Sequence, residues 1–296
     1  MIVVTAPTSN IGRQVLENVL RGNEAIRVIV RDPAKLPAAT RARVEVVTGS
    51  HGDADVVARA FAGAASVFWL VPPNLRAASV AAAYVDFTRP ACAAWRAAGV
   101  ARVVGVSALG RGVVANAGFV SASLAMDDLI AGSGVAYRAL TMPSFMDNIL
   151  RQVEPIRSRG LFFGPIARDL KAPTCATRDI AAVAAKLLLD RTWSGNGDAP
   201  VLGPEDLSFA ELAQIMSEVL GKPVQYQQIG NDAFKARLLE QGASEAMAQG
   251  MVDMMAAKNA GLDNAQPRTR ENTTPTTFRQ WCEEILKPAV NRQNNS

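Results

Sequence analysis

The sequence is poor in the residues that most metal sites and hydrolytic triads require. Among its 296 residues it has one histidine, His51. A histidine-rich metal site is therefore excluded, and a Ser/His/Asp triad could be built only around His51. Its three cysteines, Cys92, Cys175 and Cys282, lie far apart and form no CxxC pair. This usage favours a reducing compartment, so we expect a cytoplasmic protein without a bound metal.

Runs of charge and long apolar runs are also missing. The formal net charge is +4 and the sequence pI is about 9.1, but no cluster of lysine or arginine concentrates the excess. This pattern argues against a nucleic-acid partner. No apolar run is long enough to span a bilayer, and no basic segment precedes the first apolar run. We therefore expect a small-molecule substrate, with no nucleic-acid or membrane partner and no signal peptide.

The first thirty-one residues predict one β-α-β unit. Residues 2–4 form a short apolar run, apolar side chains recur at helical spacing over residues 11–20, and residues 26–30 are again apolar. In a dinucleotide-binding fold, the loop between the first strand and the helix holds a pyrophosphate on the helix N-terminus.

Two of the three glycines of such a loop are replaced. The three positions hold Ala6, Ser9 and Gly12. Gly12 would allow close packing of the helix. Ala6 adds a methyl group at the tight turn, and Ser9 adds a side chain near the phosphate, although its hydroxyl could donate a hydrogen bond. Two interpretations stay open: a weakened phosphate-binding loop, and an ordinary loop in a β-α-β unit.

Basic residues follow the second predicted strand. Arg31 stands at the strand end, and Lys35 follows four residues later. An acid at the strand end would bind the ribose hydroxyls of NAD, whereas an arginine favours the additional phosphate of NADP. The sequence therefore predicts NADP(H) as the cofactor, and a charged surface loop is the alternative.

Strands and helices continue to alternate as far as residue 150. Apolar strands are expected at 44–47, 65–70, 103–106 and 137–140, with helices at 53–61, 76–98 and 120–131 between them. This order predicts an α/β fold with a doubly wound parallel sheet of the Rossmann type, in which ligands bind beyond the C-terminal ends of the strands.

The loops at those strand ends supply the candidate cofactor contacts. His51 lies where an adenine is expected and could stack on it; otherwise it is a polar surface residue. The candidate cofactor-binding residues are Thr5, Ser9, Asn10, Ile11, Gly12, Arg31, Lys35, Ser50, His51, Leu70, Val71, Pro72, Ser107, Pro143 and Phe145.

The pattern changes after residue 150. Residues 161–164 could be a strand or a turn, and strands are expected at 201–204 and 224–227. Helices are expected at 178–189, 208–220, 232–240, 244–258 and 276–286. Ser208 and Glu211 form a capping box at the start of one helix. We expect a smaller, mostly helical substrate lobe over 151–290, with the helix near 178–189 packing back on the Rossmann domain (1–150), and a disordered tail over 291–296.

Segments from most of the chain resemble the NmrA-like group of atypical short-chain dehydrogenases/reductases. They include VVTAPTSNIGRQV, VIVRDPAKL, FWLVPP, VARVVGVSALG, SGVAYRALTMPSFMDNIL, TRDIAAVAAKLL and VLGPEDLSFAELAQIMSEVLGKPV. FWLVPP is also similar to the branch of ergot-alkaloid-type reductases and their bacterial relatives. The resemblance implies a Rossmann domain, a smaller C-terminal substrate lobe and NADP(H). Members reduce quinones, iminium compounds or phenylpropanoid-type substrates, and others are NADP-sensing regulators without catalysis.

The sequence departs from these reductases at the expected proton donor. The group implies a tyrosine, and a lysine four residues later, on the helix before the sixth strand, where the tyrosine protonates a carbonyl. Phe119 and Ser123 occupy those positions, and residues 110–128 contain neither tyrosine nor lysine. Ser107 and Ser123 are left as candidate catalytic residues that could relay a proton.

Three functions stay open. The first is an NADP(H)-dependent reductase of an iminium or quinone-like small molecule, which already carries or delocalises charge and needs little acid. The second is a non-catalytic NADP(H)-sensing or cofactor-free binding protein, which the changes at Ala6 and Ser9 and the missing tyrosine–lysine pair favour. A non-redox enzyme, such as an isomerase or cyclase, is the third alternative.

Overall fold

The computed structural model describes residues 1–113 and 116–292 and divides the chain into two compact units. The first unit consists of Met1–Ala108, Val120–Thr141 and Ile180–Pro200. The second consists of Leu109–Phe119, Met142–Asp179 and the chain from Val201 onward. The chain therefore passes between the units several times. The predicted division had one boundary, at residue 150, with the helix near 178–189 packing back on the first domain, and Ile180–Pro200 belongs to the first unit.

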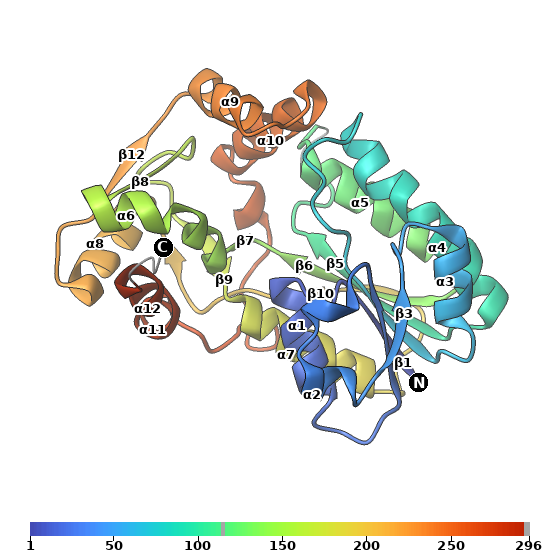
Figure 1. The fold of residues 1–296 in the computed structure, drawn as a ribbon. Coiled ribbons are helices and arrows are strands. Elements are labelled where there is room, and N and C mark those ends of the chain that lie inside the picture. Colours follow the sequence, from blue (N-terminus) through green and yellow to red (C-terminus); the bar gives the residue numbers. More distant parts are fainter. Residues whose placement is uncertain (114–115, 293–296) are drawn as a thin grey trace. The chain divides into compact units, whose positions relative to one another are not determined.

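The first unit contains the predicted doubly wound parallel sheet. Its seven strands follow the order β10-β6-β5-β4-β1-β2-β3 (Figure 1). The parallel registers Ile2↔Ile26 and Ile2↔Ser66 place β1 between β2 and β4. The strands are β1 (Ile2–Thr5), β2 (Ile26–Val30), β3 (Glu45–Thr48), β4 (Ser66–Trp69), β5 (Arg102–Ala108), β6 (Ala136–Met142) and β10 (Asn196–Pro200). This topology confirms the predicted fold class.

The seventh strand, β10, lies outside the predicted segment. A strand was expected at 201–204, but Val201 and Leu202 follow β10 as buried, irregular chain, and Leu202 forms an isolated bridge with Thr273. The Asn-Gly-Asp start of β10 is polar and exposed, with low strand propensity. Parallel pairing with β6 defines this strand instead.

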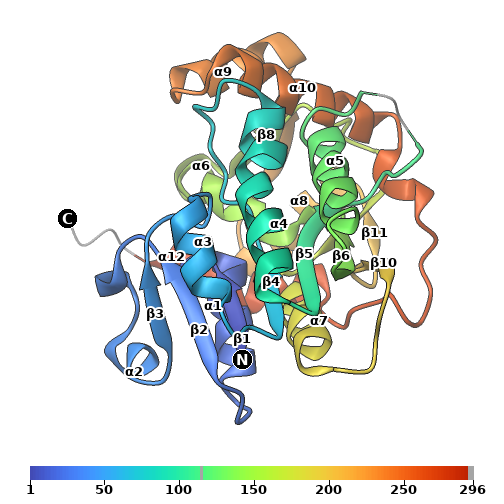
Figure 2. The ribbon, with the colours of Figure 1, turned by 90° about the vertical axis from the view of Figure 1, so that its right-hand side faces the viewer.

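Helices cover both faces of the sheet, as Figures 1 and 2 show: α3, α4 and α5 lie on one face, and α1 and α7 on the other. Fully buried aromatic side chains, including Phe61, Trp69 and Trp95, fill the first of these interfaces. The helical segments are α1 (Asn10–Val19), η1 (Pro33–Lys35), α2 (Ala38–Arg41), α3 (Ala54–Phe61), η2 (Ala82–Asp86), α4 (Phe87–Ala98), α5 (Phe119–Ala131) and α7 (Thr177–Leu189). Because both faces are covered, every residue of β1 is buried.

The second unit combines short strands with helices around its own core. β11, β9 and β7 form one sheet, and β12 pairs with β8 in another. Phe162, Phe278 and Trp281 are among the buried core residues, and Ser208 and Glu211 form the predicted capping box. The elements are β7 (Ser144–Phe145), η3 (Met146–Gln152), α6 (Val153–Arg159), β8 (Leu161–Gly164), β9 (Ala172–Cys175), β11 (Asp206–Leu207), α8 (Phe209–Leu220), β12 (Gln225–Gln228), α9 (Asn231–Glu240), α10 (Glu245–Asn259), η4 (Leu262–Ala265), α11 (Phe278–Trp281), η5 (Cys282–Leu286) and α12 (Lys287–Asn291).

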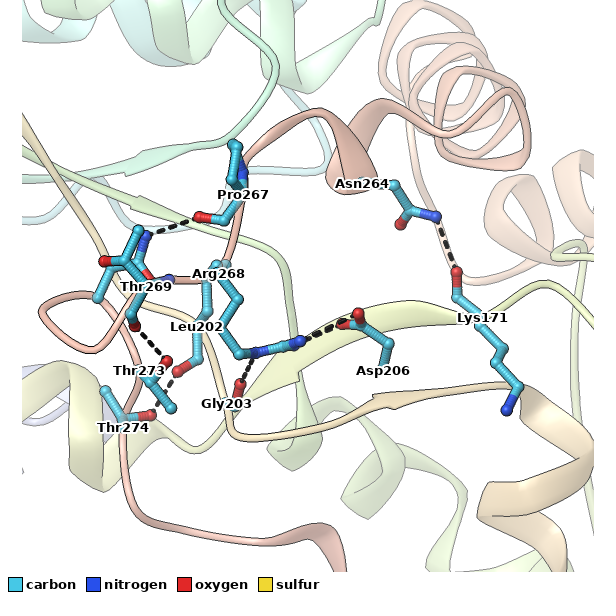
Figure 3. A network of polar contacts seen from close by, with 11 residues as sticks. Lys171, Leu202, Gly203, Asp206, Asn264, Pro267, Arg268, Thr269, Thr273 and Thr274 are labelled. Atoms are coloured by element: carbon cyan, nitrogen blue, oxygen red, sulfur yellow. Dashed lines mark hydrogen bonds and ion pairs between the residues drawn. The ribbon is translucent and has the colours of Figure 1, made fainter.

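A polar network fastens the irregular segment after η4 to the rest of the second unit (Figure 3). Arg268 donates to the carbonyl of Gly203 at 2.9 Å and forms a two-pronged ion pair with Asp206. Thr274 Oγ1 donates to the carbonyl of Leu202 at 2.9 Å. These bonds order a stretch that has no regular secondary structure, because its backbone groups find partners outside a helix or a sheet.

The C-terminal helix ends at Asn291, where the disordered tail was predicted to begin, and residues 293–296 of that tail lie outside the described residues. Over residues 1–113 and 116–292, no helix is both long enough and apolar enough to cross a bilayer.

Candidate cofactor and active site

The loop between β1 and α1 has the shape of a phosphate-binding turn despite its missing glycines. Ala6 adopts φ +47°, the left-handed conformation for which glycine is normally used. Ser9 is the N-cap of α1, and its Oγ accepts a hydrogen bond from the Gly12 N–H at 3.0 Å. An α-helix has no internal acceptors for its earliest N–H groups, so this end of α1 can bind an anion.

Gly12 is required by the backbone around it. A Cβ atom at this position would lie 2.1 Å from the carbonyl oxygen of Ala6 and 2.9 Å from Ser9 Oγ. The glycine therefore brings the first turn of α1 directly against the loop, the close approach that a dinucleotide pyrophosphate needs. The residues of this loop fit an NADP(H) cofactor, with Asn10 and Ile11 beginning the helix.

The Ser9 hydroxyl forms hydrogen bonds within its own loop. Its hydrogen is donated to the carbonyl oxygen of Ala6 at 2.8 Å. Because a hydroxyl has one hydrogen to donate, Ser9 has none left for a phosphate in this arrangement. In this arrangement Ser9 shapes the turn and caps the helix, and its role as a cofactor contact stays a prediction.

Two exposed basic residues follow β2. Arg31 and Lys35 are both exposed, and Lys35 ends the short helix η1. The intervening acid, Asp32, is turned back on its own loop, where its carboxylate accepts from the Ala34 N–H at 3.0 Å. The two cations are therefore presented at the strand end where a ribose phosphate would be read.

His51 lies in the core of the first unit and is only 6% exposed. Its Nε2 lies 2.9 Å from the carbonyl oxygen of Leu70, and its ring makes edge contacts with Trp69 and Phe87. Burial lowers the pKa of His51 to about 4, an effect that the Leu70 hydrogen bond opposes and the Arg31 charge reinforces. The expectation of a surface histidine, or one available to stack on adenine, is therefore corrected.

Two other residues predicted to bind the cofactor, Thr5 and Ser50, form hydrogen bonds to backbone groups near the strand ends. Thr5 is fully buried: its Oγ1 donates to the carbonyl of Phe68 and accepts from the Leu70 N–H, both at 2.9 Å. It therefore ties β1 to β4 and does not present its hydroxyl to a ligand. Ser50 Oγ accepts from the Gly52 N–H at 3.2 Å and stabilises its own turn. Val71 and Pro72 are half-buried where the chain leaves β4.

Ser107, a candidate catalytic residue, belongs to a buried polar network. Its Oγ donates to Oδ2 of Asp127, and Tyr137 donates its hydroxyl hydrogen to Oδ1 of the same carboxylate at 2.6 Å. Ser123 Oγ lies 3.4 Å from Ser107 Oγ. Ser107 is 7% exposed, and Asp127 and Tyr137 are each 2% exposed. The two candidate catalytic serines are thus brought together, beside an acid that was not predicted.

The spacing of residues on α5 and a glycine on β5 allow these side chains to meet. Ser123 and Asp127 are four residues apart, so they share one face of α5. A Cβ atom at Gly105 on β5 would lie 2.4 Å from the Tyr137 hydroxyl oxygen, so the glycine makes room for that hydroxyl. An acid in the apolar helix FVSASLAMDDLIA was the available signal for Asp127, but its partners lie on β5 and β6, the strands before and after this helix, and not on the helix itself.

Three predicted site residues belong to the second unit. Phe119, at the expected tyrosine position, is the first residue of α5 and is half-buried. Pro143 is buried, and Phe145 lies half-buried on β7. Pro143 and Phe145 stay predictions as cofactor contacts, and Phe119 stays a prediction as the residue at the catalytic tyrosine position.

Two family models match the chain. One, described as NAD(P)H-binding, matches residues 8–191, and the other, described as NmrA-like family, matches residues 131–282. The chain belongs to the NmrA-like family. The predicted family, fold class and cofactor class are confirmed.

Several relatives of this NmrA-like chain are named as reductases or oxidoreductases. The NAD(P)H azoreductase of Xenophilus azovorans is 28% identical over 264 residues, which cover 86% of each chain. Quinone oxidoreductase 2 of Escherichia coli strain K12 is 25% identical over 281 residues, covering 94% of this chain and 95% of the relative. An NADPH-dependent quinone oxidoreductase from Escherichia coli, crystallised with NADPH, matches with a TM-score of 0.77 and 25% identity over 98% of both chains. The chain is therefore a member of a family of NADP(H)-dependent reductases.

Proposed function

We propose that this protein reduces an electron-poor small molecule, an iminium or quinone-like compound, with NADPH. The hydrogen bond from Ser107 to the Asp127 carboxylate carries this proposal. The single hydroxyl hydrogen of Ser107 is donated inside the protein, and Ser123 replaces the lysine that would support an acidic tyrosine. A simple ketone becomes an alkoxide that needs a proton donor at once, whereas an iminium or quinone acceptor does not.

Bound NADPH would supply the hydride. The N-terminus of α1 and the close turn at Gly12 would hold its pyrophosphate, and Arg31 with Lys35 would bind the ribose phosphate. The contribution of the protein is then mainly the orientation and proximity of the two reactants, which can lower a barrier by about 7–11 kcal/mol.

The names of the relatives support this class of acceptor. One relative is an azoreductase and another a quinone oxidoreductase, so both are named for conjugated acceptors. A non-catalytic NADP(H)-binding protein is the second candidate. The burial of the Ser107 and Tyr137 hydroxyls favours it, because a hydroxyl enclosed in the core serves stability without any reaction.

The test is NADPH oxidation with three acceptors: a substituted benzoquinone, a cyclic iminium salt and a simple cyclic ketone. The proposal expects turnover with at least one of the first two and negligible turnover with the ketone. NADPH binding, measured separately by fluorescence, with no turnover of any acceptor would favour the non-catalytic candidate. Faster reduction of the ketone would refute the proposal and point to an unrecognised acid.

A further inference from the structure

The hydroxyl of Ser107 is held in one orientation by Asp127. The Asp127 carboxylate accepts one hydroxyl hydrogen on each oxygen, from Ser107 on β5 and from Tyr137 on β6. The three side chains are all buried, so water does not compete freely for these bonds. The hydrogen of Ser107 therefore points toward α5.

This orientation decides what Ser107 can offer a ligand. A serine hydroxyl has one hydrogen and two lone pairs. Asp127 takes the hydrogen, and Ser123 Oγ, 3.4 Å away, engages at most one lone pair. Toward a ligand Ser107 is then a hydrogen-bond acceptor. A group that carries N–H complements such a position, whereas the carbonyl oxygen of a quinone or ketone, which has only lone pairs, does not.

We infer that the Ser107–Asp127 pair makes the site selective for a protonated imine over a quinone, with Ser107 as the contact and Asp127 as the positioning residue. The inference rests on the proposed function and narrows its substrate class. The reaction balances without a catalytic acid. The imine carbon gains a hydrogen with two electrons from NADPH, the electrons of the C=N π bond move to nitrogen and neutralise its charge, and the products are a secondary amine and NADP⁺.

The test variant is Asp127→Asn, which keeps the shape and reverses the polarity. The amide oxygen can still accept from Tyr137, while its NH₂ group donates to Ser107 and frees the serine hydrogen for a ligand. We expect the ratio of kcat/KM for a protonated cyclic imine to that for a benzoquinone to fall about tenfold or more, as for the loss of a hydrogen bond to a charged group. Ser107→Ala should lower the same ratio by removing the acceptor.

Tyr137→Phe is the matched control, because it removes a buried bond to Asp127 and leaves the Ser107 hydrogen directed at the carboxylate. Its ratio should stay at the parent value even if both rates fall. A purely structural role for Asp127 would lower both rates together in Asp127→Asn and leave the ratio unchanged, and that result would overturn the inference.

Equilibrium binding gives a second readout that does not need turnover. With NADP⁺ present, a cyclic secondary ammonium ion should bind the parent about tenfold more tightly than Asp127→Asn or Ser107→Ala. NADPH affinity should be equal in the parent, Asp127→Asn and Tyr137→Phe. Intact ammonium selectivity without any turnover would reject the proposed function alone. Turnover with no ammonium selectivity would reject only the inference, and the absence of both would reject both.

Discussion

Gly12→Ala tests whether the turn before α1 is as tightly closed as the structure indicates. The new Cβ would lie 2.1 Å from the Ala6 carbonyl oxygen, and ordinary contacts begin near 3.4 Å, so atoms must move by about 1.3 Å (3.4 − 2.1). The obstacle is backbone, and Ala6 is already in the left-handed region, so no side chain can rotate away to relieve the contact.

The expected loss of stability combines three terms. Overpacking typically costs about 1–3 kcal/mol, and disturbing the Ser9 cap adds about 1 kcal/mol. Alanine in place of glycine within a helix returns about 1 kcal/mol. The free energy of unfolding should therefore fall by about 1–3 kcal/mol, which lowers Tm by roughly 2–12 °C at 2–4 °C per kcal/mol for a domain of this size class. NADPH affinity should fall as well, because the displaced Ala6 carbonyl and helix N-terminus form the pyrophosphate site.

Gly22→Ala is the matched control in the same β-α-β unit. A Cβ atom there would meet no atom closer than 3.5 Å, and the residue is exposed. Thermal unfolding and fluorescence titration with NADPH should separate the two variants clearly. Equal Tm values and equal NADPH affinities for Gly12→Ala and Gly22→Ala would refute the close approach of α1 to the loop.

Four further changes have defined outcomes. Ala6→Val should lower the free energy of unfolding in urea by about 2 kcal/mol, because a β-branched side chain strains φ +47°, while Ala6→Gly should be neutral or stabilising. Arg31→Ala should weaken NADPH binding about tenfold more than NADH binding in parallel titrations, and an equal loss for both would exclude a phosphate contact. Thr5→Val should cost about 2–4 kcal/mol in urea unfolding by leaving the Phe68 carbonyl and Leu70 N–H without their partner, and a loss below 0.5 kcal/mol would contradict that role. The pKa of His51 is near 6.5 in the unfolded state and about 4 in the folded state, so the unfolded state takes up the proton first as the pH falls. The free energy of unfolding should therefore be highest above pH 6.5 and fall by about 3 kcal/mol toward pH 4. His51→Phe should remove this dependence from the urea midpoints measured between pH 6.5 and 4.

Features that depend on a short stretch of chain could be predicted from the sequence. The β-α-β unit and the special role of Gly12 follow from the spacing of apolar residues and from one loop. The Ser208 capping box was likewise visible because its two residues lie three apart. In each case the sequence neighbours are also the physical partners.

Features that depend on partners in other helices or strands were missed. His51 is buried because Trp69 and Phe87 close around it, and neither lies near it in the sequence. Asp127 was overlooked because its two hydroxyl donors come from β5 and β6.

The pairing of β6 with β10 also affects how the sheet can form while the chain is being synthesised. β6 ends at Met142, but its outer partner β10 spans Asn196–Pro200 and is synthesised much later, after a long stretch of the second unit. Until then, one side of the growing sheet carries unpaired N–H and C=O groups, a template for wrong pairing with other chains. A fragment that ends near residue 150 would keep that edge open permanently, so a fragment meant to fold and bind nucleotide should extend at least through Pro200.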